Sequence, residues 1–179
     1  EIVQIQNHLE EEKRLLKREG FSFDPALKLG AMIETPAAAL SADGFAQRLD
    51  FLSIGTNDLS QYTLAIDRTD DQVNYLFDPL HPAVLRLIHN VIQASKKNGI
   101  PVSLCGELAG DDRYTRLLLG MGLREFSMSP SLLPEVKQEV LNTRVDMTEP
   151  LVEQILQSPF HDEIYRLFEQ INRFSPDHS

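Results

Sequence analysis

The feature that most constrains the fold is a repeated alternation of short apolar runs with helix-like segments. Four such runs are continuously apolar, and they span residues 27–34, 50–55, 101–106 and 125–129. A run without regular polar alternation is typical of a parallel strand, because helices cover such a sheet. The pattern therefore predicts an α/β fold with four parallel strands.

The helices of this pattern carry start and stop signals. Gly20 stands where the opening amphipathic segment should end, and Asn98-Gly99 closes a longer helical segment that His81-Pro82 opens. Thr35-Pro36 combines an N-cap with a proline in the first helical position. These signals predict helices on both sides of the first strand and before the third.

Two folds share this pattern, an open doubly wound sheet and a (β/α)8 barrel. The dinucleotide-binding form of the first requires G-x-G-x-x-G after a strand, which the sequence lacks. Polar residues instead follow the carboxyl ends of all four strands, where a barrel carries its active site; they are Glu34, Asn57-Asp58, Cys105-Gly106-Glu107 and Ser127-Met128-Ser129. Since a barrel needs eight strands and about 250 residues, these 179 residues are expected to form half of one.

Charge and composition argue against several classes of protein. The net charge of −10 disfavours a nucleic-acid partner, because phosphate backbones require clustered Lys and Arg. Membrane insertion is not expected, since no run approaches the roughly 20 apolar residues of a bilayer span. The single cysteine precludes an internal disulfide and fits a reducing compartment, so we expect a cytoplasmic location. The chain opens on Glu1 within helix-like sequence, which predicts a piece of a longer protein.

Two carboxylates form the first candidate site. Glu34 and Asp58 follow strands that should be neighbours, so their side chains are expected to converge. Like charges at close range require a proton or a cation, and oxygen ligands without histidine or thiolate favour Mg²⁺. The residues alone allow a second interpretation, in which Glu34 caps the helix that begins at Pro36 and Asp58 caps the next one.

Arg68 and Cys105 also have two interpretations each. A guanidinium one short helix after Asp58 can bind a phosphate or carboxylate beside the metal, or can pair with Asp67 or Asp70. A thiol at the end of an apolar strand can protonate a substrate carbon or act as a nucleophile. It can equally serve as a small buried apolar group.

Four longer stretches, in order along the chain, are MIETPAA, FLSIGTNDLSQYTLAIDR, CGELAGD and LLLGMGLREFSMS. Together they resemble Enzyme I of the phosphoenolpyruvate-dependent sugar phosphotransferase system, in its C-terminal phosphoenolpyruvate-binding barrel domain. The resemblance implies that residues 1–145 form the C-terminal half of a TIM-type (β/α)8 barrel. Residues 146–179 would then form a helical tail packed on it.

The resemblance also implies roles for single residues. Glu34 and Asp58 match the family's Mg²⁺ ligands. Asn57 and Arg68 match residues that contact the substrate phosphate, and Asp58 belongs to the same substrate-binding group. Cys105 matches the catalytic cysteine that protonates the enolate carbon as pyruvate forms.

The implied reaction transfers the phosphoryl group of phosphoenolpyruvate to a histidine. In the family this histidine lies in an N-terminal domain, which passes the group on to the phosphocarrier protein HPr. Neither that domain nor the first barrel strands occur in this chain, so the chain is expected to be inactive alone. The family dimerises through the barrel domain, so a homodimer is also expected.

Two alternatives remain from the sequence. The parent can be a related enzyme that uses phosphoenolpyruvate, either pyruvate phosphate dikinase or phosphoenolpyruvate synthase, which share the barrel and a GTNDL-like turn. The segment can also be a dimerisation module without activity of its own. Because a half-barrel leaves sheet edges and one sheet face open, the isolated chain is expected to self-associate.

Overall fold

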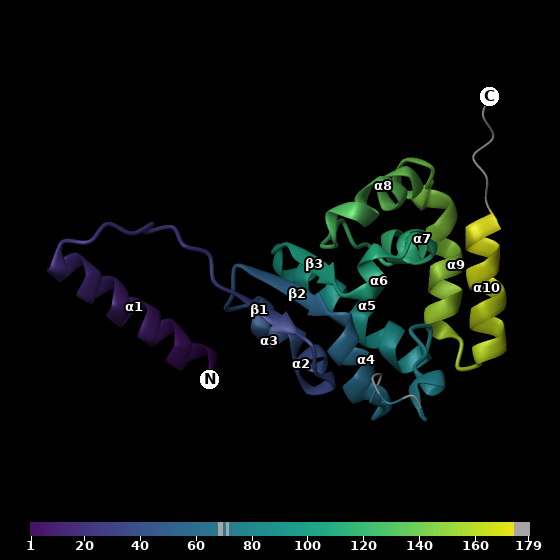
Figure 1. Cartoon of the computed structure of the whole chain (residues 1–179), viewed down its shortest axis with the longest axis horizontal. Helices are drawn as coiled ribbons and strands as arrows, with labels where there is room; N and C mark the ends of the chain where they lie inside the picture. Colours follow the sequence, from purple (N-terminus) through teal and green to yellow (C-terminus); the bar gives the residue numbers. More distant parts are fainter. Residues whose placement is uncertain (68–69, 71, 174–179) are drawn as a thin grey trace.

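The computed structural model describes residues 1–67, 70 and 72–173. Its single sheet has four parallel strands in the order β1-β2-β3-β4 (Figure 1). The strands are β1 (Gly30–Ile33), β2 (Phe51–Gly55), β3 (Val102–Cys105) and β4 (Glu125–Phe126). Each strand pairs with the next one along the chain, which is the connectivity of a barrel. The predicted α/β class with four parallel strands is confirmed, and it agrees with part of a TIM-type barrel.

The helices connect the strands and then continue beyond them. Before and between the strands lie α1 (Ile2–Glu19), α2 (Pro36–Leu40), α3 (Ala42–Ala46), α4 (Thr56–Leu64), the 3-10 helix η1 (Asn74–Leu76), α5 (Pro82–Asn98), α6 (Glu107–Gly110) and α7 (Asp112–Gly120). After β4 come the 3-10 helix η2 (Pro130–Leu132), α8 (Leu133–Leu141), α9 (Val145–Gln157) and α10 (His161–Arg173).

The two faces of the sheet differ in chemistry. Side chains alternate along a strand, so paired positions in parallel strands share a face. One face carries fully buried aliphatic side chains, which belong to the main core; they are Ile33, Leu52, Ile54 and Leu104. The opposite face carries Met32 and Phe51, which are 48% and 38% exposed, beside Ser53, Ser103 and Cys105. The apolar strands therefore have one helix-covered face and one mixed face.

Helix α5 is the centre of the core. His81 caps it, because its Nδ1 accepts a hydrogen bond from the backbone N–H of Ala83 at 3.1 Å, and Pro82 occupies the first turn. Gly99 ends it in the left-handed conformation, as Asn98-Gly99 predicts. The helix buries a stripe of side chains against α2, α3 and strands β2 and β3; it comprises Val84, Leu85, Ile88, Val91 and Ile92.

The C-terminal helices pack beside the barrel portion. Helices α9 and α10 lie side by side along α7, and α9 also contacts α5 (Figure 1). Arg116 of α7 is buried, pairs with Glu139 of α8, and donates to the carbonyl of Ile171 in α10 at 3.1 Å. The division into a half-barrel of residues 1–145 and a tail of residues 146–179 stays a prediction.

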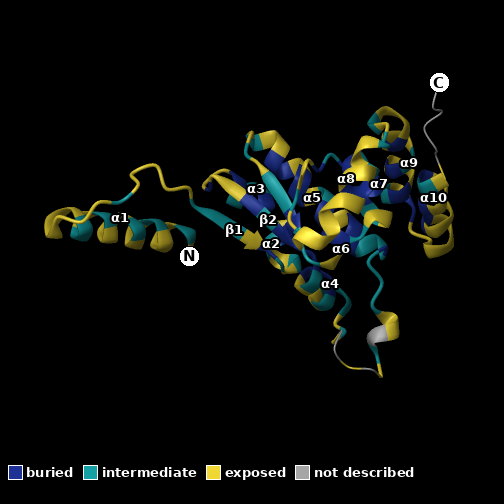
Figure 2. Ribbon diagram, turned by 45° about the horizontal axis from the view of Figure 1, so that its top comes forward, coloured by how far each residue is buried: buried dark blue, intermediate teal, exposed yellow. Residues whose placement is uncertain are grey.

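Helix α1 projects away from the sheet and its helices (Figure 2). It ends at Gly20 in the left-handed conformation, as expected, but it buries no residue. Gln6 donates to the carbonyl of Arg48 at 2.8 Å, which links α1 to the segment before β2. Among the helices that the structure describes, none has both the length and the apolar character that a bilayer crossing requires.

Candidate functional site

The carboxyl ends of β1 and β2 bring Glu34 against Gly55. Glu34 directly follows β1, and the register pairs Ile33 with Ile54. A Cβ placed on Gly55 would lie 3.0 Å from the Cβ and 3.1 Å from Oε2 of Glu34. Because Gly55 has no side chain, the carboxyl group of Glu34 can lie against it. Gly55 precedes Asp58 by three residues.

Neither carboxylate is an N-cap. Helix α2 is capped by Thr35, whose hydroxyl accepts a hydrogen bond from the N–H of Ala38 at 3.3 Å. Helix α4 begins at Thr56 after Gly55, so Asp58 lies in its first turn as an exposed side chain. The capping interpretation of Glu34 and Asp58 is therefore wrong. A carboxylate in the first turn of a helix is nevertheless stabilised by the helix dipole.

Asn57 binds the turn that follows β3. Its Oδ1 accepts a hydrogen bond from the backbone N–H of Glu107 at 3.1 Å. Because that oxygen is the acceptor, the side-chain nitrogen Nδ2 is left as the donor on the other side of the amide. The hydroxyl of Thr56 donates to the carbonyl of Cys105 at 2.8 Å, so two consecutive residues of α4 hold the end of β3.

Gly106 makes this junction possible. Its φ of +97° and ψ of −175° belong to a region that is essentially restricted to glycine. A Cβ at this position would lie 2.5 Å from Oγ1 of Thr56 and 2.8 Å from Oδ1 of Asn57. The close approach of the two loops therefore depends on a glycine between Cys105 and Glu107.

Cys105 ends β3 on the mixed face of the sheet. Its thiol is half-buried, donates to the carbonyl of Ile54 at 3.4 Å, and lies 3.8 Å from Sδ of Met32. The hydroxyl of Ser53 is 3.9 Å from the sulfur, and Ser103 donates to Ser53 at 3.1 Å. The thiol therefore has polar neighbours and partial exposure, which differ from the surroundings of a cysteine that serves only as core.

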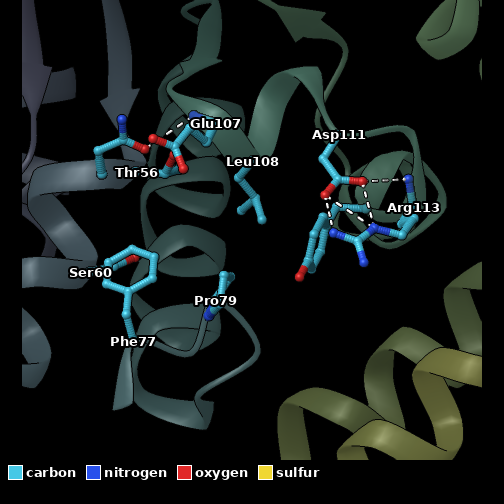
Figure 3. A pocket seen from close by; sticks show the side chains of 10 residues that line it. Thr56, Ser60, Phe77, Pro79, Glu107, Leu108, Asp111 and Arg113 are labelled. Carbon is cyan, nitrogen blue, oxygen red and sulfur yellow. Dashed lines mark hydrogen bonds and ion pairs between the residues drawn. The ribbon is translucent and has the colours of Figure 1, made fainter. Parts of the chain in front are cut away.

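A cavity of about 300 Å³ lies beside Asn57 (Figure 3). Its wall comes from α4, from the loop before α5, and from the segment that begins with α6; it comprises Thr56, Asn57, Ser60, Phe77, Pro79, Glu107, Leu108, Asp111, Arg113 and Tyr114. Arg113 and Asp111 form a close ion pair at 2.5 Å within this wall. The hydrogen bond from Arg113 lowers the pKa of Asp111. The carboxylate and the guanidinium therefore neutralise each other within the cavity wall.

The remaining site predictions have different outcomes. Arg68 lies outside the described residues. Of the serines after β4, Ser129 shares a hydrogen bond of 3.2 Å with Ser131.

Across residues 1–67, 70 and 72–173, no group of three or more His, Cys, Asp and Glu side chains is placed to hold a metal ion. The donor set of Glu34 and Asp58 still fits Mg²⁺, which commonly binds one or two carboxylates and completes its shell with water and substrate oxygens.

The supporting residues of this site were not among the sequence-based predictions. Thr56 and Gly55 do not carry charge, so residue type alone gave no reason to select them. The signal that was available is the glycine itself, because Gly55 and Gly106 each stand directly at a strand end next to a polar residue.

Comparison with known proteins gives consistent matches. Residues 1–145 match the family described as "PEP-utilising enzyme, PEP-binding domain". The chain is 56% identical over 158 residues to the phosphoenolpyruvate-protein phosphotransferase of Cupriavidus necator, an alignment that covers 88% of this chain and 27% of that protein.

Two further relatives carry the same name. The protein of Haemophilus influenzae is 46% identical over 170 residues, which cover 95% of this chain and 30% of that protein. The protein of Listeria monocytogenes is 46% identical over 172 residues, with the same coverage of 95% and 30%. The chain thus spans less than a third of the length of the curated relatives it matches.

Proposed function

This chain belongs to the PEP-utilising enzymes through their PEP-binding domain, and we propose that it is part of a phosphoenolpyruvate-protein phosphotransferase. The observation that carries the proposal is the identity of 56% over 158 residues to a relative of that name. The three relatives quoted above all carry this name, which supports the phosphotransferase over the dikinase and the synthase. The whole protein would transfer the phosphoryl group of phosphoenolpyruvate to a histidine of another domain, and from there to HPr.

In this proposal, Glu34 and Asp58 hold Mg²⁺ beside the substrate. A bound Mg²⁺ would neutralise the negative charge that the phosphoryl group carries during transfer. The position of Glu34 against Gly55 supports this role, because the carboxyl group lies at the end of β2 that leads directly to Asp58. The first turn of α4 adds a favourable dipole for an anionic ligand and for Asp58 itself.

Asn57 is proposed to bind the substrate phosphate through Nδ2. Its Oδ1 is already engaged by the N–H of Glu107, which fixes the orientation of the amide and turns its donor group away from that turn. An amide donor is suited to a phosphate oxygen, which can only accept. Arg68 is proposed as a second phosphate ligand, since a guanidinium can donate two parallel hydrogen bonds to a phosphate.

Cys105 is proposed as the acid that completes the reaction. When the phosphorus–oxygen bond breaks, the remaining enolate needs a proton on its terminal carbon to become pyruvate. The thiol can deliver that proton because it is partly exposed on the mixed face of the sheet, next to Met32 and Ser53. The resulting thiolate would recover a proton from water after pyruvate leaves.

The protein is also proposed to act in sugar transport, in the cytoplasm, as a homodimer. These expectations follow from the family resemblance and the reducing environment that a single free cysteine suits.

The carboxylate pair provides the test of the proposed function. In the full-length protein, Glu34→Gln and Asp58→Asn keep the shape of each side chain and remove its charge. Each is expected to lower turnover with phosphoenolpyruvate by about a hundredfold or more, which is the usual cost of losing one electrostatic contact in a transition state. Glu135→Gln is the matched control, because Glu135 is an exposed carboxylate in the first turn of α8. Near-normal turnover of both site variants at ordinary Mg²⁺ concentration would refute the metal assignment.

A further inference from the structure

A separate group of polar side chains joins α10 to the loop between α4 and α5. Asp78 of this loop accepts a hydrogen bond from the hydroxyl of Tyr165 at 2.9 Å, and its Oδ2 lies 3.1 Å from Nδ1 of His161. Tyr165 follows Asp78 by 87 residues along the chain. We call Asp78, His81, His161 and Tyr165 the Asp78 cluster.

The carboxylate of Asp78 is the shared acceptor of the cluster. Its Oδ1 accepts a second hydrogen bond, from the backbone N–H of Leu80 at 2.8 Å, and its side chain is only 18% exposed. The carbonyl of Asp78 accepts from the N–H of His81 at 3.1 Å. A largely buried carboxylate is costly to leave without partners, so α10 and the loop constrain each other.

His81 connects the cluster to the start of α5. Its ring meets the ring of His161 edge to face, with centroids 5.0 Å apart. Burial, and then the neighbouring His161, lower the pKa of His81, which favours the neutral imidazole. A neutral ring is what the cap of α5 requires, because Nδ1 must accept the hydrogen bond from Ala83.

Tyr165 is the residue of α10 that donates a hydrogen bond to Asp78. Burial first, and then the hydrogen bond to Asp78, raise its pKa to about 12, so the hydroxyl keeps its proton and can donate. Tyr165 and His161 lie one helical turn apart, which presents both side chains on the same side of α10.

The residues on either side of Asp78 are part of the cavity wall. Phe77 and Pro79 face the same cavity as Thr56 and Asn57 (Figure 3). The position of this short segment is therefore set from outside the cavity, through Asp78, by a helix that lies beyond the residues matched to the family. We infer that Asp78 is a positioning residue, through which His161 and Tyr165 hold the cavity wall next to Asn57. Its consequence for catalysis rests on the proposed phosphate-binding role of Asn57.

Two conservative substitutions test the link without removing either ring. His161→Phe keeps the ring contact with His81, and Tyr165→Phe keeps the aromatic side chain, while both lose their polar contact to Asp78. In the double variant, hydrogen exchange of the backbone amides over residues 72–80 is expected to be about tenfold faster, because the loop loses the hydrogen bond from Tyr165 and the polar contact from His161. Exchange in β2, β3 and α9 should stay unchanged. His161→Asn, whose amide can donate near the position of Nδ1, should restore most of the protection lost in His161→Phe.

Arg166→Gln is the matched control, because Arg166 is an exposed cation of the same helix that pairs only at 4.0 Å with Glu163 in the described contacts. It should leave exchange over residues 72–80 unchanged. Unchanged exchange in the double variant, or an equal increase throughout α9 and the strands, would overturn the inference. The second result would mean that the cluster only stabilises the fold.

Kinetics of the full-length protein then separate positioning from stability. The double variant is expected to raise KM for phosphoenolpyruvate about tenfold with little change in kcat, the pattern of lost substrate binding. A loosened loop with an unchanged KM would also overturn the positioning role. If the wild-type protein shows no turnover with phosphoenolpyruvate, the proposed function fails, and the exchange result still decides whether α10 holds the cavity wall.

Discussion

Replacing Gly106 by alanine tests the junction between α4 and the end of β3. The backbone of Gly106 lies at φ +97° and ψ −175°, where any other residue is strained. Such strain costs about 1–3 kcal/mol. The new methyl group would also stand 2.5 Å from Oγ1 of Thr56 and 2.8 Å from Oδ1 of Asn57, so at least one of these atoms must move.

Both atoms take part in hydrogen bonds, so the loss of one of these bonds adds to the free-energy cost of the backbone strain. Thr56 donates to the carbonyl of Cys105 at 2.8 Å, and Asn57 accepts from the N–H of Glu107 at 3.1 Å. Losing one such hydrogen bond costs about 1 kcal/mol. The free energy of unfolding of Gly106→Ala should therefore fall by about 2–4 kcal/mol, which corresponds to a decrease in Tm of roughly 5–15 °C for a chain of this size.

Urea unfolding followed by circular dichroism, together with calorimetry, measures this change. Gly122→Ala is the matched control, since Gly122 has a similar φ of +99° but its Cβ would meet only Ile92, at an ordinary 3.6 Å. The control carries the strain of a positive φ without the contacts to Thr56 and Asn57. If Gly106→Ala unfolds at the same urea concentration as Gly122→Ala, the argument that these two side chains require a glycine is wrong.

Three further predictions follow from single features. Cys105→Ala should leave the fold intact, because a half-buried thiol is small. In the full-length protein it should slow pyruvate formation with KM nearly unchanged. Pyruvate formation at the wild-type rate would mean that Cys105 has only a packing role. The isolated chain should sediment as a self-associated species at micromolar concentration, since Met32 and Phe51 are 48% and 38% exposed on an open sheet face, and a clean monomer would contradict this. Because the pKa of Tyr165 is raised from 10.0 to about 12, its contribution to stability is complete below pH 10 and is lost as the pH rises through 12. Tyr165→Phe should remove that part of the pH dependence in unfolding measured at pH 9 and at pH 11.5, and an identical dependence in both proteins would count against it.

The sequence was a good guide wherever the signal is local. Thr35-Pro36 begins α2, Gly20 ends α1 and Gly99 ends α5, as expected, because capping and left-handed glycine depend on a few adjacent residues. The strand order also followed from the chain, since parallel strands joined by short helical crossovers pair with their neighbours. The positions of Glu34, Asn57-Asp58 and Cys105 at strand ends could therefore be predicted from the sequence.

Local reasoning left a choice where two neighbouring residues compete for one role. Both Glu34 and Thr35 were candidate caps for α2, and the shorter hydroxyl side chain of Thr35 accepts the hydrogen bond from Ala38. The boundary of β1 likewise lies at Gly30, three residues after the start of the apolar run at Leu27. Hydrogen bonding between strands decides such boundaries, and composition does not.

The class of fold, the order of the strands and the residues at their carboxyl ends thus follow from local sequence patterns. Three features depend on the packing of distant segments: Asn57 accepts from the N–H of Glu107, Gly106 must lack a side chain, and Asp78 is bound by Tyr165 from 87 residues away. Each of these contacts joins segments at least 49 residues apart in the chain. No spacing rule links such residues, because their distance is set by the packing of whole helices and strands on a shared core.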